Sequence, residues 1–366
     1  MRDRTDLEQR RHLPLNAKIL MSQNRIREWY NHWDGDVYVS FSGGKDSTVL
    51  AHLVHDLYPD VPLVFSNTGL EYPEIRRFAE ASGADVIRPE MNFVEVVKTY
   101  GYPIVSKEVA EAIYIARRMD DGAKRWRDSK RKELMGQRLL PDGRKSPYNK
   151  TKWLPLCRDT DFKISHWCCH VMKKNPFKAY EKRTGRKPYI GSLAEESKLR
   201  ELSWLKHGCN AFDIDRPVSN PLSFWTEQDI LQYIAQNELH IASVYGNIVS
   251  IDDDGFEYDA FAGDKLVCSG VNRTGCIFCG FSTHLEKGET KFQKLARTHP
   301  KQYAYCMGGG EYVDNPDYDP SAPAMDGDWV NWNPQKIWVP SKDGLGMKHV
   351  FDECNEIYGK DFIRYE

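Results

Sequence analysis

The sequence lacks an excess of charge of either sign, because 53 acidic residues nearly balance 51 basic ones. A net charge of −2 gives the whole chain no electrostatic pull toward nucleic acids or membranes. No apolar run is long enough to span a bilayer. Residues 1–6 are charged and have no apolar core, so they do not resemble a signal peptide. We therefore expect a soluble, cytoplasmic protein with no membrane partner.

A Walker A sequence, in which Gly, four residues and Gly-Lys-Ser/Thr follow one another, is also missing. Instead, a β-branched and aromatic run at 37–41 stops at Ser-Gly-Gly, and a helical pattern begins at Asp46. Such a strand, glycine turn and helix N-terminus can hold an anion with backbone N–H groups. The alternatives are an ordinary strand-to-helix turn and, for Asp46, a helix N-cap. The residues predicted to bind phosphate are Ser42, Gly43, Gly44, Lys45, Asp46 and Ser47.

Strands and helices are predicted to alternate along the first two thirds of the chain. The strands are expected at 37–41, 62–67, 85–89 and 188–191. This alternation predicts an α/β fold, a Rossmann-like doubly wound parallel sheet with ligands at the carboxyl ends of its strands. The turn Asn67-Thr68-Gly69 follows the second strand and should face the same ligand.

We expect three regions along the chain. They are an N-terminal helical segment at 1–34, a nucleotide-binding domain at 35–235, and a largely irregular or helical metal-binding region at 236–366. The second region contains a basic insertion at 117–152, in which Lys and Arg far outnumber the acids and aromatic residues are interleaved. This insertion could hold a nucleic-acid backbone or a polyphosphate. The alternative is a solvated helical hairpin.

The nine cysteines are an odd number, which favours metal or redox chemistry over a disulfide framework. Cys276 and Cys279 form a Cys-x-x-Cys turn, whose spacing lets both thiolates face one metal centre. Cys168 and Cys169 are adjacent, which strains binding to a single tetrahedral ion but suits different irons of a larger cluster. Four thiolates therefore suggest a [4Fe–4S] cluster, with zinc as the alternative and free core thiols as a further one.

These motifs together resemble the phosphoadenosine phosphosulfate (PAPS) reductase family of the PP-loop ATP pyrophosphatase superfamily, whose fold is adenine nucleotide alpha hydrolase-like. The paired cysteines resemble those of the cluster-bearing branch, which includes adenylyl-sulfate reductases and sulfur-transfer enzymes of DNA phosphorothioation. The matching residues are Ser42-Gly43-Gly44-Lys45-Asp46-Ser47, Asn67-Thr68-Gly69, Cys168-Cys169 with Lys173 and Pro176, Gly191 with Glu195-Glu196-Ser197 and Arg200, Pro221-Leu222 with Trp225-Thr226 and Asp229, and Gly275-Cys276 with Cys279.

The resemblance implies an enzyme that binds ATP, adenylylates an acceptor and releases pyrophosphate. Sulfur, delivered by a donor protein, would then replace the activated group on an acceptor such as nucleic acid. Mg²⁺ would bridge the phosphate oxygens, and the cluster would order the site or bind the incoming sulfur. The catalytic residues implied are Lys45, Asp46 and Arg200, with Asn67, Thr68 and Gly69 on the adenosine side and Cys168, Cys169, Cys276 and Cys279 as metal ligands.

Two other functions stay open at this point. The first is thiol-dependent reduction of a sulfonucleotide, with a thioredoxin-like reductant and Cys306 or Cys354 as nucleophile. The second is a non-catalytic module that binds nucleotide and nucleic acid and holds structural zinc. The sequence around Cys354 lacks the glycine and histidine of the reductases' Glu-Cys-Gly-Leu-His tail, and Leu193 stands where family members often carry arginine. A homodimer is compatible with each function.

Overall fold

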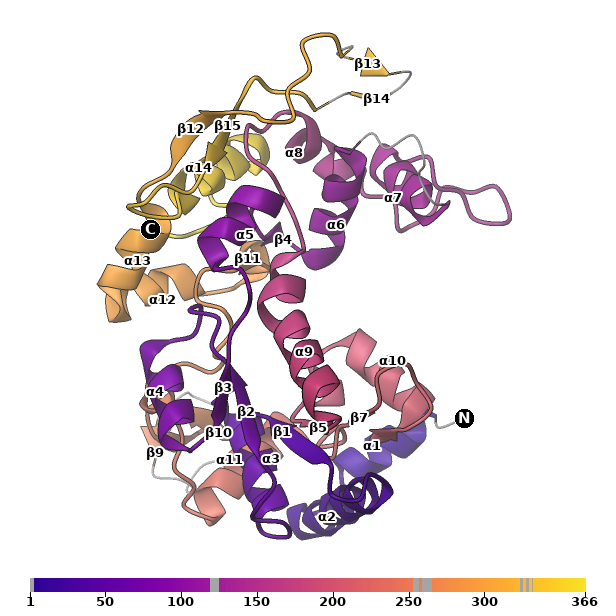
Figure 1. The fold of residues 1–366 in the computed structure, drawn as a ribbon, viewed down its shortest axis with the longest axis vertical. Helices are drawn as coiled ribbons and strands as arrows, with labels where there is room; N and C mark the ends of the chain where they lie inside the picture. Colours follow the sequence, from indigo (N-terminus) through magenta and orange to yellow (C-terminus); the bar gives the residue numbers. More distant parts are fainter. Residues whose placement is uncertain are drawn as a thin grey trace. The chain divides into compact units, whose positions relative to one another are not determined.

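The computed structural model describes residues 3–118, 125–252, 257–258, 265–322, 325–326, 329–330 and 332–366 (Figure 1). The chain forms two compact units, and it passes between them three times. Unit 1 contains residues 1–89 and 175–276, and unit 2 contains residues 90–174 and 277–366. The unit boundaries lie at positions other than the expected region boundaries at 34 and 235, and that three-region division stays a prediction.

Unit 1 is built on a six-stranded sheet in the order β3-β2-β1-β5-β7-β6. All neighbouring strands are parallel except β6 and β7. The chain moves outward from β1 to β2 and β3 and returns to β5 on the other side of β1, so the order reverses between β1 and β5. This arrangement confirms the predicted doubly wound parallel sheet. The strands are β1 Val37–Ser40, β2 Leu63–Ser66, β3 Asp85–Ile87, β5 Lys187–Ile190, β6 Asn210–Ala211 and β7 Val218–Ser219.

Helices cover this sheet, and α3 is the central one because it contacts β1, β5, α2 and α11. Its apolar side is fully buried through Val49, Leu50 and Leu53. A small antiparallel sheet, β10-β8-β9, follows α11 along the chain. The helices are α1 Arg4–Arg11, α2 Leu15–His32, α3 Lys45–His55, α4 Pro73–Ala81, α9 Asn175–Thr184, α10 Lys198–His207 and α11 Glu227–Gln236, and the small strands are β8 Ile248–Ile251, β9 Glu257–Tyr258 and β10 Lys265–Cys268.

A buried ion pair fixes α2 to the N-terminus of α11. Lys18 Nζ lies 2.6 Å from Asp229 Oδ2, and the two side chains are 2% and 11% exposed. The same lysine donates to the carbonyl of Arg11. The spacing of Thr226 and Asp229, three residues apart in the sequence, predicts a capping box, and the structure confirms it. The ion pair therefore positions the first turn of α11, which carries Glu227.

Replacing Lys18 by methionine is expected to lower the free energy of unfolding by about 3 kcal/mol, because Asp229 would stay buried without its cation. Urea denaturation measures this loss. The control is Lys178→Met, which changes an exposed lysine of α9 in the same unit. A loss no larger than that of the control would contradict the role given to the pair.

Unit 2 is mainly helical, with short paired strands. β4 pairs with β11 in parallel, and β12 pairs with β15 and β13 with β14 in antiparallel fashion. The abundance of Gly, Pro, Asp and Trp in 308–335 predicts a long irregular segment, and this is wrong at β12, where Glu311–Asp314 pairs with Lys336–Val339. The elements are α5 Phe93–Tyr100, β4 Ile104–Val105, α6 Lys107–Ala116, α7 Arg125–Met135, α8 Leu154–Arg158, β11 Gly280–Phe281, α12 Lys291–Thr298, α13 Pro300–Met307, β12 Glu311–Asp314, β13 Met325–Asp326, β14 Trp329–Val330, β15 Lys336–Val339 and α14 Met347–Tyr358.

Within the described part of the chain, no helix combines the length and the apolar composition needed to cross a bilayer.

Candidate functional site

The loop between β1 and α3 lies where the strand order reverses, at the carboxyl end of β1. Gly43 has a φ of +69°, and a Cβ there would lie 3.0 Å from the carbonyl oxygen of Ile75, so the turn requires glycine. The hydroxyls of Ser42 and Ser47 lie 3.0 Å apart, and Ser47 Oγ donates to the carbonyl of Gly44. These bonds fix the backbone at the N-terminus of α3, where the first amides have no hydrogen-bond partner within the helix.

Hydroxyl groups line the space above Gly44. A Cβ at Gly44 would lie 3.2 Å from both Ser42 Oγ and Tyr245 Oη and 3.4 Å from Thr274 Oγ1. The amide of Lys45 donates to Tyr245 Oη at 3.3 Å, and that oxygen lies 2.6 Å from Thr274 Oγ1. A phosphate oxygen placed here would meet backbone amides on one side and two hydroxyls on the other. Sequence reasoning missed Tyr245 and Thr274.

The side chain of Lys45 is buried and already has partners. Its Nζ forms an ion pair with Glu227 and donates to the carbonyl of Asn272 at 2.9 Å. Lys45 is 5% exposed, whereas the side chain of Glu227 is 40% exposed. The more exposed glutamate is therefore the partner that can move aside, and a phosphate can replace its carboxylate at the Lys45 ammonium.

Asp46 lies beside three cations and a second carboxylate. The pKa of Asp46 is raised to about 6, mainly by burial and also by the charge of Glu227, while Lys45, Arg273 and Arg200 act in the opposite direction. Burial in turn lowers the pKa of Arg200, and the charge of Asp46 opposes that effect. Arg200, predicted from the sequence, is thus electrostatically connected to the loop, and it also pairs with Glu196.

The raised pKa of Asp46 predicts a pH-dependent stability. Because the folded protein holds this proton up to about pH 6 and the unfolded chain releases it near 3.8, stability falls as pH rises between these values. Asp46→Asn cannot ionise, so it should be more stable than wild type by roughly 3 kcal/mol above pH 7. The gain should shrink toward zero near pH 4. Urea denaturation from pH 4.5 to 8 checks this, with the exposed Asp60→Asn as control; a gain independent of pH would contradict it.

Two further predicted segments approach the loop from neighbouring strands. Gly191 follows β5, and a Cβ there would lie 2.9 Å from the carbonyl oxygen of Asp46, so only glycine permits this close approach. The Asn67–Gly69 turn follows β2, the other strand next to β1. In this turn the hydroxyl of Thr68 donates to Glu71, and the amide of Gly69 donates to Asn67 Oδ1. All these residues lie at one edge of the sheet, and their roles in binding stay predictions.

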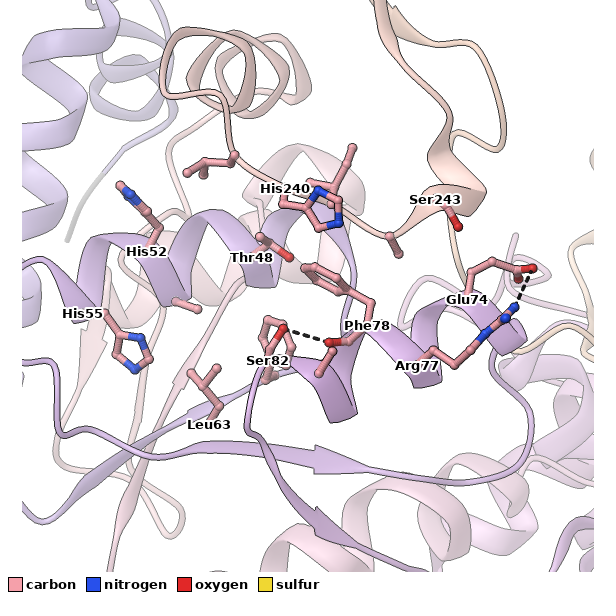
Figure 2. Close-up of a pocket in the computed structure, with 16 residues that line it drawn as sticks. Thr48, His52, His55, Leu63, Glu74, Arg77, Phe78, Ser82, His240 and Ser243 are labelled. Atoms are coloured by element: carbon pink, nitrogen blue, oxygen red, sulfur yellow. Dashed lines mark hydrogen bonds and ion pairs between the residues drawn. The ribbon is translucent and has the colours of Figure 1, made fainter.

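A cavity beside α3 is a different space. It has a volume of about 690 Å³ and lies between α3, α4 and the segment 239–243 of unit 1. Figure 2 shows the side chains of Thr48, Phe78 and His240 converging on it. None of the residues predicted to bind phosphate lines this cavity. The anion site and this cavity are therefore separate features of unit 1.

Cys168 and Cys169, in unit 2, begin a helical turn that continues through residues 170–174 as a π-helix. A hydrogen bond from Cys168 lowers the pKa of Cys169 to about 5, and Lys107 and Lys173 act in the same direction against burial. Cys279, also in unit 2, accepts a hydrogen bond at its carbonyl from Lys291. Cys276 is the last residue of unit 1. Among the described residues, no three cysteine sulfurs lie within 4.8 Å of one another.

Cys306 and Cys354 are both fully buried in unit 2. Burial raises the pKa of the Cys306 thiol well above its usual range, with Lys291 opposing the effect. A thiol that attacks a sulfonucleotide must be accessible and ionised. Neither cysteine meets this requirement in the conformation described here.

Several residues of the predicted basic insertion form hydrogen bonds and ion pairs within unit 2. Arg117 donates to the carbonyls of Leu156, Cys157 and Phe162, and its guanidinium lies 4.1 Å from the ring centroid of Trp332. Glu133 pairs with Lys130, Arg138 and Lys150. Arg117 therefore has a structural role. The packing of α6 against α7 agrees with the alternative expectation that this segment is a helical hairpin. Lys124 and the side chains of Arg125, Trp126 and Arg127 lie outside the described residues.

Comparison with known proteins supports the family predicted from sequence. Residues 36–133 match the phosphoadenosine phosphosulfate reductase domain. The chain is 25% identical over 228 residues to phosphoadenosine 5'-phosphosulfate reductase of Xanthomonas oryzae pv. oryzae (strain PXO99A), covering 62% of this chain and 73% of the relative. It is 31% identical over 67 residues to the reductase of Escherichia coli O139:H28, covering 18% of this chain and 28% of the relative.

Two solved structures were also found to be similar. A phosphoadenylyl-sulfate reductase from Candida auris, in complex with phosphate, has a TM-score of 0.34 and 14% identity, covering 66% of this chain and 90% of that one. A U34-tRNA thiolase from Methanococcus maripaludis with its [4Fe-4S] cluster has a TM-score of 0.28 and 13% identity, covering 62% and 66%. These TM-scores are too low to support a conclusion about the fold or the function of this chain.

Proposed function

We propose, from the match of residues 36–133 to the phosphoadenosine phosphosulfate reductase domain, that the chain is an enzyme that binds an adenine nucleotide at residues 42–47. We propose further that it activates an acceptor by adenylylation, and that sulfide-level sulfur from a donor then replaces the adenylylated oxygen, which leaves as part of AMP. The observation that supports this most is the glycine loop at the carboxyl end of β1, with Lys45, Ser47 and the backbone of Gly191 gathered around it.

In the proposed reaction, an acceptor oxygen attacks the α-phosphorus of ATP and the bond to pyrophosphate breaks. The amides of Gly44 and Lys45 and the Lys45 ammonium would hold the departing phosphates and stabilise their charge. Tyr245 and Thr274 would donate hydroxyl hydrogens to the same oxygens. Mg²⁺, when bound, would neutralise phosphate charge, and Asp46 and Glu227 are the carboxylates available to hold it. Arg200 would pair with a phosphate, and Asn67, Thr68 and Gly69 would line the adenosine side.

Four cysteines are proposed to hold a metal centre, either a [4Fe–4S] cluster or zinc. The donor set fits such a group, because Cys276 and Cys279 have chelating spacing and Cys168 and Cys169 lie beside Lys107 and Lys173. Cationic neighbours favour the thiolate form that a metal requires. A cluster would supply an iron to which incoming sulfur can bind, whereas zinc would be structural.

Adenylylation predicts isotope exchange between pyrophosphate and ATP in the presence of the acceptor. Because the acceptor is unidentified, the first assay offers duplex DNA, transfer RNA and sulfate separately. Exchange that is lost in Lys45→Ala and kept in Lys178→Ala supports the proposal. Nucleotide binding with no turnover on any of these would instead favour a non-catalytic binding module, to which the remaining basic residues of 117–152 could recruit nucleic acid.

Reduction of a sulfonucleotide by a thiol is the second candidate, and the similarity to phosphoadenosine 5'-phosphosulfate reductases favours it. In that case sulfite would be released, a thioredoxin-like reductant would be needed, and a cysteine would be the nucleophile.

The burial of Cys354 predicts that it is not that nucleophile. Cys354→Ser is expected to keep nucleotide turnover within about twofold of wild type, because the side chain is 0% exposed and has a packing role. Sulfite release from adenylyl sulfate, measured with and without thioredoxin, tests this. Cys209→Ser, another buried cysteine, controls for loss of folding. Complete loss of sulfite release in Cys354→Ser alone would establish the reductase and the nucleophile together.

A further inference from the structure

Three side chains of unit 2 bring carboxylate and imidazole atoms together. His349 and Glu353 lie one turn apart on α14, and Asp161 comes from the segment after α8. His349 Nε2 lies 3.0 Å from Asp161 Oδ1 and 2.9 Å from Glu353 Oε1. All three ligand atoms lie within 4.8 Å of one another, and the side chains are 20–26% exposed. The nucleotide loop and the four cysteines contribute nothing to this group.

Neighbouring side chains orient two of these three residues, Asp161 and His349. Tyr312, on β12, donates its hydroxyl hydrogen to Asp161 Oδ2 at 2.6 Å, which leaves Oδ1 directed to His349. The ring of Trp338, on β15, lies 4.4 Å from the His349 ring between centroids. A hydroxyl that holds a carboxylate and a ring that fixes an imidazole are typical of the surroundings of metal ligands.

The group has acceptor capacity that its neighbours do not satisfy. Two carboxylates share one imidazole nitrogen, and among the described residues no donor reaches the buried Glu353 Oε2. Arg117 is a nearby cation, but its donors bind carbonyls and Thr160. A buried carboxylate oxygen without a donor normally marks a place for water or an ion. This oxygen is the second observation that indicates a ligand at the cluster.

We propose that Asp161, His349 and Glu353 form a binding site for a divalent transition-metal ion such as Mn²⁺ or Zn²⁺. One imidazole and two carboxylates suit these ions better than they suit Mg²⁺ or a thiolate-preferring metal. Three protein ligands leave further positions on the ion for water or substrate oxygens, as in metal sites that do chemistry. The alternative is a protonated His349 that bridges two carboxylates and binds no metal.

Titration with Mn²⁺, followed by the electron paramagnetic resonance signal of the free ion, tests this on the full chain without nucleotide. Mn²⁺ is the probe because it binds thiolates weakly, so the four cysteines interfere little. Wild type is expected to bind one Mn²⁺ at this site. Glu353→Gln should weaken that binding at least about tenfold, and Tyr312→Phe on the order of tenfold, because it removes only the orienting hydrogen bond. Glu356→Gln changes an exposed carboxylate on the same helix and should bind as wild type does.

Thermal melting gives a second readout. Mn²⁺ should raise the melting temperature of wild type and Glu356→Gln, but not that of Glu353→Gln, because only the folded site binds the ion. If Glu353→Gln does not fold, Tyr312→Phe decides, since it keeps all three ligands. Equal Mn²⁺ binding in wild type, Tyr312→Phe and Glu353→Gln would overturn the proposal, as would the absence of Mn²⁺ binding by wild type.

Discussion

Gly44→Val is expected to lower the affinity for ATP by about 100-fold or more, because the new side chain fills the space in which a phosphate would lie. Its Cβ would already contact Ser42 Oγ and Tyr245 Oη at 3.2 Å, and its methyl groups extend further. A displaced phosphate loses at least two charge-assisted hydrogen bonds, each contributing roughly 1.5–3 kcal/mol. Calorimetric titration with a non-hydrolysable ATP analogue and Mg²⁺ measures the effect.

The matched control for this prediction is Gly83→Ala, also in unit 1. Gly83 has a φ of +73°, and no atom lies within 4 Å of the position that a Cβ would take there. The substitution therefore costs about 1 kcal/mol of stability without blocking a site. Lys45→Ala should weaken binding by about 30-fold through the loss of one charged contact. Unchanged affinity in Gly44→Val would show that the nucleotide does not bind against this loop.

Cys279→Ser is expected to remove most of the metal from the protein, because it takes away one of four proposed thiolates and half of the chelating turn. Anaerobic purification followed by iron, zinc and sulfide analysis, with an absorption spectrum, measures the loss. Wild type should contain iron and sulfide if the centre is a cluster, and zinc alone if it is structural. Cys209→Ser, a buried cysteine outside the proposed set, should keep the full content.

Two results would contradict this second prediction. Full metal content in Cys279→Ser would exclude the turn as a ligand. If wild type contains neither iron nor zinc after anaerobic purification, the four cysteines do not bind a metal centre and are ordinary thiols. A colourless protein containing only zinc would keep the site but exclude sulfur chemistry at iron.

Local sequence patterns predicted the parts of the fold that local physics determines. The β-branched run before Ser42, the two glycines and the apolar spacing of α3 correctly predicted a strand, a turn and a helix. The capping box at Thr226 and Asp229 was also read correctly, because its residues lie three apart. The apolar spacing of 15–33 predicts a helix with Leu20 and Ile26 on its buried face, and the helix is confirmed as α2. Ile26 is fully buried as predicted, but Leu20 is 62% exposed, and Trp29, outside the predicted face, is fully buried.

Contacts between residues distant in sequence could not be predicted from the chain alone. Tyr245 and Asn272 form hydrogen bonds with Lys45 across 200 and 227 residues of sequence. No periodic pattern of residues in the sequence indicates such distant pairings. Both come from the part of the chain where the regular alternation of strands and helices ends. Arg117 was grouped with a basic surface because its charge was visible, while its burial under Trp332 was not. The groups that close the phosphate site are therefore a finding of the structure.

A crystal structure with a non-hydrolysable ATP analogue and Mg²⁺ tests the central claim most directly. The account predicts a phosphate within hydrogen-bonding distance of the amides of Gly44 and Lys45, with the Glu227 carboxylate moved away from Lys45. An analogue bound instead in the cavity between α3 and α4, with Tyr245 still hydrogen-bonded to the Lys45 amide, would contradict it.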